Sequence, residues 1–152
     1  MIQAIDHINI VVADLDRSVA FYTEVLGLQV TRTAHLEGDW IEAIVGLRGV
    51  VADVVYVEPP GGGLRLELLQ YLSPTGEAIA INREPNTQGL RHIAFRVADI
   101  DAATARLRAA GAPVVADPVA VPSGVVKHDA GHKRLVYFHD PDGVLLELAE
   151  YT

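Results

Sequence analysis

The segment HINIVVADLD at residues 7–16 returns later in the chain as HIAFRVADID at residues 92–101, with the same alternation and the same closing acidic residues. A second segment behaves alike, because LEL at residues 66–68 reappears at residues 146–148. Each half of the chain therefore carries one copy of each segment, in the same order. Two copies predict a pair of similar modules, whereas a solenoid needs about three or more repeats.

Alternation, helical spacing and turn residues predict the elements of each module. The first module is expected to hold a strand over 5–12, a helix that follows Asp14 and ends at Gly27, and strands around 28–36, 50–58 and 64–71. The second is expected to hold a strand over 92–97, a helix over about 100–110, and strands near 113–117, 134–139 and 144–150. The predicted fold class is α+β with paired βαβββ modules, 1–72 and 90–152, joined by a connector over 73–89 within one domain, 1–152.

Bulk composition narrows the classes of function. The chain has 152 residues, of which 50% are hydrophobic and 21% charged, and no apolar run approaches the length of a membrane span. Acidic residues outnumber basic ones by 20 to 12, which gives a formal charge of -8 and leaves no basic patch for nucleic acid. Cysteine is absent, and we expect no leader, since the first residues lack a basic segment followed by an apolar one. We expect a soluble cytoplasmic protein without nucleic-acid or membrane partners.

The two modules repeat a histidine and a glutamate at equivalent places: His7 and Glu67, then His92 and Glu147. Strand parity turns each histidine away from the most apolar face and sets each glutamate among apolar neighbours. Taken singly, a strand histidine is more often a hydrogen-bonded core residue, and a strand glutamate more often lies at a solvated edge. Taken together, two imidazoles and two carboxylates predict a site for one divalent ion, namely Zn, Ni, Co, Mn or Fe(II).

These residues, together with FYTEVLGL at 21–28, DPDG at 140–143 and LLEL at 145–148, resemble the vicinal oxygen chelate superfamily. That group includes glyoxalase I, methylmalonyl-CoA epimerase, extradiol dioxygenases and the bleomycin and fosfomycin resistance proteins. The resemblance implies a cupped mixed sheet, a homodimer, and metal positions at His7, Glu67, His92 and Glu147. It also implies a small substrate that chelates the metal through two neighbouring oxygens while the metal acts as a Lewis acid. Glu67 or Glu147 would then double as general base.

The resemblance leaves the reaction open between lyase or epimerase chemistry, an extradiol-type dioxygenase, and a drug-binding resistance protein without turnover. Val11 stands where glyoxalase I sequences commonly have an arginine. Methylmalonyl-CoA epimerase sequences are more similar, although their HPKS segment is HDPD at 139–142 here. A dioxygenase would use His7, His92 and Glu147 on Fe(II).

Three further residues are candidate substrate contacts: Asn9, Trp40 and Arg96. Trp40 stands in a segment that is predicted as a loop or a short helix and would line an apolar wall, although core packing explains it about as well. Arg96 shares the strand face of His92 and would meet an anionic group or pair with a nearby glutamate.

Overall fold

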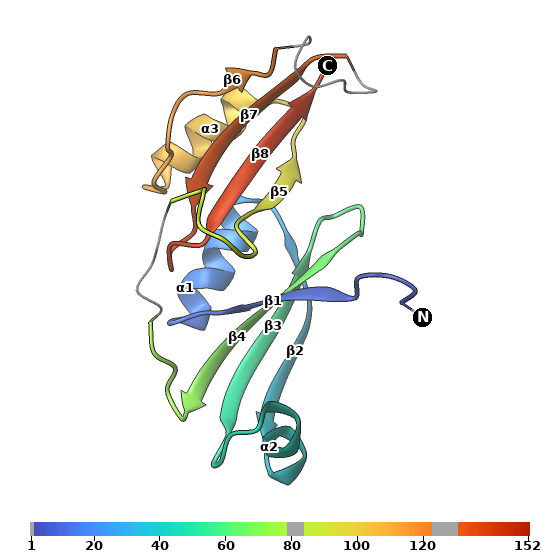
Figure 1. The fold of residues 1–152 in the computed structure, drawn as a ribbon, viewed down its shortest axis with the longest axis vertical. Coiled ribbons are helices and arrows are strands. Elements are labelled where there is room, and N and C mark those ends of the chain that lie inside the picture. Colours follow the sequence, from blue (N-terminus) through green and yellow to red (C-terminus); the bar gives the residue numbers. More distant parts are fainter. Residues whose placement is uncertain (1, 79–83, 123–130) are drawn as a thin grey trace. The chain divides into compact units, whose positions relative to one another are not determined.

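Each half of the chain folds into a four-stranded mixed sheet with a helix packed against one face (Figure 1). The computed structural model describes residues 2–78, 84–122 and 131–152, and it divides into two compact units, Met1–Ala80 and Ile81–Thr152. The strand orders are β1-β4-β3-β2 and β5-β8-β7-β6. In each sheet the module's first and last strands run parallel and the other neighbours run antiparallel. The predicted α+β class with βαβββ modules is confirmed.

The first unit follows the predicted order. Its elements are β1 (His7–Val11), α1 (Leu15–Ala20), the π-helical turn η1 (Phe21–Val25), β2 (Gln29–Glu37), α2 (Asp39–Val45), β3 (Val51–Glu58) and β4 (Arg65–Ser73). Asp14 caps α1 as predicted, because its side chain accepts a hydrogen bond from the Arg17 N–H at 2.9 Å. The single predicted helix thus consists of a short α-helix that widens into the π-helical turn, and Gly27, with a φ of 79°, follows it.

The second unit contains β5 (Ile93–Arg96), α3 (Ile100–Ala109), β6 (Val119–Ala120), β7 (Lys133–His139) and β8 (Leu145–Tyr151). The prediction of a strand over 113–117 is wrong, because only a single bridge joins Val114 to Phe138 and the next strand begins at Val119. Pro118 has no N–H to donate to a ladder, and the carbonyl of Ala116 accepts a hydrogen bond from Arg108 at 3.3 Å instead. The chain therefore leaves the sheet after Val114 and pairs with β7 again in β6.

Both helices dock on their sheets through the same contact. Gln70 of β4 accepts a hydrogen bond from the Leu15 N–H at 2.9 Å, and Glu150 of β8 accepts one from the Ile100 N–H at 3.0 Å. These side chains lie on the same sheet face as buried leucines of β4 and β8, so the helix covers the apolar face of each sheet. In the second unit the carboxylate of Glu150 also lies at the positive end of α3, where it stabilises the helix.

The faces under the helices hold most of the buried core. The most completely buried side chains include Leu66, Leu68 and Tyr22 in the first unit, and Leu146, Phe138, Ile100 and Leu107 in the second. No helix in the described part of the chain is both long enough and apolar enough to cross a lipid bilayer. The connector predicted over 73–89 begins in β4, and its residues 79–83 lie outside the described ranges.

Candidate active site

The sheet face opposite α1 carries the predicted site residues of the first unit. The parallel register pairs His7 with Arg65 and Asn9 with Glu67, and the antiparallel register places Tyr56 across from Glu67. Because side chains alternate along each strand, all of these point to the side of the sheet away from α1. We call this side, and the equivalent side of the second sheet that carries His92 and Glu147, the site face of each unit.

His7 and Glu67 lie within reach of each other on this face. The distance from His7 Nε2 to Glu67 Oε2 is 3.4 Å. On the other side of the imidazole ring, Nδ1 lies 2.7 Å from Asp6 Oδ2, and Asp6 also accepts a hydrogen bond from Arg65 at 2.7 Å. The hydrogen bond from His7, followed by the charge of Arg65, lowers the pKa of Asp6. A histidine that donates from Nδ1 to a carboxylate keeps its Nε2 lone pair free for a metal.

Glu67 is held by two neutral donors. Asn9 donates from Nδ2 to Oε2 at 2.7 Å, and the hydroxyl of Tyr56 donates to Oε1. The hydrogen bond to Glu67, with a smaller contribution from burial, raises the pKa of Tyr56 to about 12, so the phenol stays protonated near neutral pH. Tyr56 also meets the His7 ring edge-on, with the ring centroids 5.8 Å apart. The carboxylate is therefore fixed in position without being neutralised.

The second unit repeats this arrangement with one change. His92 Nε2 lies 3.5 Å from Glu147 Oε2, and the His92 ring packs at 5.2 Å from that of Tyr137, which stands across from Glu147 in the register. Burial, followed by the charge of Glu147, raises the pKa of Tyr137. Where the first unit uses Asn9, the second uses a cation, because Lys133 Nζ lies 3.4 Å from Glu147 Oε1. The Glu147 side chain is only 5% exposed.

The spacing of each pair fits a shared divalent ion. Two donor atoms that bind one Zn²⁺ at about 2.1 Å with tetrahedral angles lie about 3.4 Å apart. The two His–Glu separations, 3.4 and 3.5 Å, have that length. Each unit supplies one nitrogen and one oxygen donor, and within the described ranges no group of three or more His, Cys, Asp or Glu side chains is arranged to hold a metal. Each unit taken by itself therefore offers two donor atoms.

Comparison with known proteins agrees with this duplicated frame. Residues 4–148 match the family model of the Glyoxalase/Bleomycin resistance protein/Dioxygenase superfamily. The chain belongs to this superfamily. Among the relatives of this superfamily member, a 2-epi-5-epi-valiolone epimerase from Actinomyces sp. is 34% identical over 95% of this chain and 78% of its own length. An ethylmalonyl-CoA/methylmalonyl-CoA epimerase from Cereibacter sphaeroides is 34% identical over 99% of each chain.

A solved structure shows the same fold in this superfamily. The glyoxalase family protein from Bacillus cereus is 30% identical and has a TM-score of 0.84, over 99% of this chain and 95% of that one. The shared fold thus extends along nearly the whole chain, and the relatives include enzymes that are named as epimerases.

The other predicted substrate contacts have different surroundings. Asn9 contacts Glu67, so within its unit it positions a candidate metal ligand. Trp40 lies on α2 and is 54% exposed. Arg96 packs over the ring of Tyr151, with its guanidinium carbon 5.0 Å from the centroid, and forms no ion pair with any residue that the structure describes. Of the two alternatives for Arg96, pairing with a glutamate is therefore not seen among the described residues.

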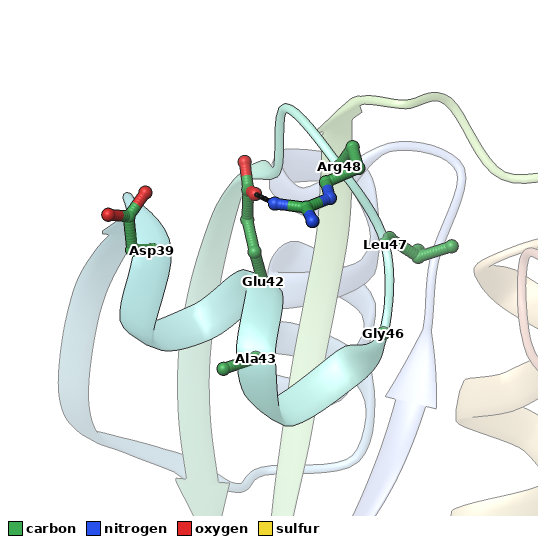
Figure 2. A pocket seen from close by; sticks show the side chains of 6 residues that line it. All are labelled: Asp39, Glu42, Ala43, Gly46, Leu47 and Arg48. Atoms are coloured by element: carbon green, nitrogen blue, oxygen red, sulfur yellow. Dashed lines mark hydrogen bonds and ion pairs between the residues drawn. The ribbon is translucent and has the colours of Figure 1, made fainter.

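A hollow beside α2 lies apart from these residues. It has a volume of about 310 Å³ and is lined by Asp39, Glu42, Ala43, Gly46, Leu47 and Arg48 (Figure 2). Figure 2 shows that Glu42 is paired with Arg48, at 3.5 Å, and Glu42 also accepts a hydrogen bond from the Gly49 N–H at 2.6 Å. The carboxylate of Glu42 in this hollow is thus already bound to neighbouring residues, and none of the residues that line the hollow is a predicted site residue.

Sequence reasoning did not assign Tyr56, Tyr137 or Lys133 to the site. Each of the two tyrosines lies beside a glutamate and a histidine of the predicted metal site. A signal exists in the sequence, because one tyrosine precedes each glutamate by 11 or 10 residues. Lys133 gives no such signal, since its first-unit counterpart is Ala52.

Proposed function

We propose that this protein is a divalent-metal-dependent enzyme that moves a proton at a carbon next to a carbonyl group, with epimerisation as the reaction. The proposed ligands of the ion are His7, Glu67, His92 and Glu147. The observation that carries the proposal is the repeated His–Glu pair, whose donor atoms lie 3.4 Å apart in one unit and 3.5 Å apart in the other. When bound, the metal would act as a Lewis acid on neighbouring oxygens of a small substrate.

The surrounding residues contact and orient the proposed donor atoms. Asp6 accepts from Nδ1 of His7 and so leaves Nε2 as the donor atom. Asn9 and Tyr56 fix Glu67 by hydrogen bonds, which orient the carboxylate while preserving its charge. Glu147 is almost fully buried, and Lys133 Nζ lies 3.4 Å from its Oε1.

Epimerisation removes a proton from one side of a carbon and returns one to the other, so it needs two groups that exchange protons. Glu67 and Glu147 supply one carboxylate each, and we assign to them the roles of base and acid in addition to metal binding. The epimerase names of two relatives that are 34% identical support this reaction. A homodimer belongs to the same proposal, and light scattering tests it directly.

Metal content tests the first half of the proposal. We expect the untagged protein to hold about one divalent ion per chain, that is, one ion for each two His–Glu pairs. Elemental analysis together with the mass in solution measures this ratio. H7A and H92A should each lower the metal content strongly. H35A is the matched control, because His35 is also a strand histidine beside a carboxylate, Asp53, but lies on the face of the helix. Metal-free protein that binds an aromatic drug would contradict the proposal.

Proton exchange tests the second half. In deuterated water, NMR should show metal-dependent exchange at the carbon next to the carbonyl when methylmalonyl-CoA or 2-epi-5-epi-valiolone is the probe. E147Q and E67Q should lower the exchange rate more than the metal content. Equal losses of both would leave the glutamates as ligands only, and a metal-loaded protein that exchanges neither probe would count against the epimerase assignment.

A further inference from the structure

Two cations pack against one aromatic ring on the site face of the second unit. The guanidinium carbon of Arg96 lies 5.0 Å from the centre of the Tyr151 ring, and Lys133 Nζ lies 5.5 Å from it. The register places Arg96 beside Ala149 and Lys133 beside Tyr151, so all three side chains share the face that carries Glu147. The aromatic ring orients both cations next to the predicted metal ligand.

The charges in this group do not balance. On the site face of β5, β7 and β8 the charged side chains are Arg96, Lys133 and Glu147, and Lys133 is the one that pairs with the carboxylate. Arg96 has no carboxylate partner among the described residues, which leaves one positive charge available to a ligand.

The first unit provides an internal comparison. The residues equivalent to Arg96, Lys133 and Tyr151 are Val11, Ala52 and Tyr71, because β1 pairs Val11 with Leu69 and β3 pairs Ala52 with Tyr71. There the tyrosine packs against an apolar cluster that includes Ala52, and no cation lies near it in any contact of the described residues. The duplicated frame thus folds around this tyrosine without either cation, so folding does not explain why the second unit carries two.

We propose that Arg96 and Lys133, both packed against the Tyr151 ring, form a recognition site for an oxyanion group of the substrate. A guanidinium presents two parallel N–H donors that match a carboxylate or a phosphate, and the ammonium adds a second charge. The inference rests on the proposed function, since it names the class of substrate that the metal enzyme accepts. Preferred substrates of this enzyme carry, beside the carbonyl that reacts, a negatively charged carboxylate or phosphate, so methylmalonyl-CoA should exchange faster than the uncharged 2-epi-5-epi-valiolone.

Anion titrations of the full chain test this site. The protein is first freed of metal with a chelator, so that an anion cannot bind to a metal ion. The probes are propionate, inorganic phosphate and the neutral isostere propionamide, followed by NMR at the Arg96 side-chain N–H and the Tyr151 ring. R96V and K133A introduce the residues that the first unit carries at these positions, and both should weaken anion binding about tenfold or more. R106A is the control, because Arg106 lies on α3, on the opposite side of the sheet.

Each outcome has a defined meaning. Binding of propionate, phosphate or both, with propionamide inert and R106A unchanged, supports the site and identifies the preferred anion. Anions that leave both reporter signals unmoved, or that bind R96V and wild type equally, overturn it. R96Q, which keeps the length and polarity of the side chain, should behave as R96V does if the charge is responsible. A protein that binds the anions but holds no metal would refute the proposed function alone, whereas metal-dependent proton exchange without anion binding would refute this inference alone.

Discussion

Tyr56→Phe removes a single hydroxyl, and we expect it to weaken metal binding. Glu67 accepts two side-chain hydrogen bonds, from Asn9 and from Tyr56, and its side chain is only 13% exposed. A hydrogen bond to a charged group contributes about 1.5–3 kcal/mol. Since about 1.4 kcal/mol changes an equilibrium constant tenfold, the affinity for Zn²⁺ should fall about 10-fold to 100-fold, which is also the usual effect of losing a residue that orients a ligand.

Competition with a chromophoric chelator measures this affinity, and Tyr71→Phe is the matched control. Tyr71 lies on the same face of the same sheet and, like Tyr56, packs against the apolar cluster of Ala52, Val54 and Leu69, but no contact of the described residues joins it to Glu67. The control should change the affinity for Zn²⁺ less than about twofold, because no hydrogen bond to a metal ligand is lost. Equal affinities for wild type and Tyr56→Phe would show that the phenol does not orient Glu67, and the reasoning would fail there.

Three further predictions concern stability. Leu146→Ala should lower the free energy of unfolding by about 2–5 kcal/mol in urea, since Leu146 is fully buried under α3, and a smaller loss would mean that the site collapses around the cavity. Asp14→Ala should lower the free energy of unfolding by about 0.5–2 kcal/mol, because the hydrogen bond that caps the Arg17 N–H is lost. An unchanged free energy of unfolding would show that this cap does not stabilise the folded protein. The hydrogen bond to Asp53 raises the pKa of His35. The stabilisation that this pair gives the folded protein is therefore complete below pH 6.5 and is lost as the pH rises through the pKa of the folded state. H35Q should remove this pH dependence from the free energy of unfolding.

The sequence predicted the frame of both units well, because local patterns specify it. Alternation in HINIVV and its repeat placed His7 and His92 on the face away from the helix, and parity did the same for Glu67 and Glu147. The failure at 113–117 has a different origin. Valine-rich composition favours a strand there, but the carbonyl of Ala116 is taken by Arg108 from a neighbouring helix, a tertiary contact that no local pattern reveals.

The partners of the glutamates were hidden for a geometric reason. Tyr56 and Tyr137 stand directly across from Glu67 and Glu147 on the neighbouring strands. In the sequence the two spacings differ, because the hairpin over 59–64 is one residue longer than the hairpin over 140–144. A comparison of the two halves at one fixed offset therefore misaligns the tyrosines, although the register aligns them. Cross-strand pairing, and not spacing along the chain, determines which donor meets each carboxylate, so substitutions that shift either hairpin by one residue should separate tyrosine from glutamate.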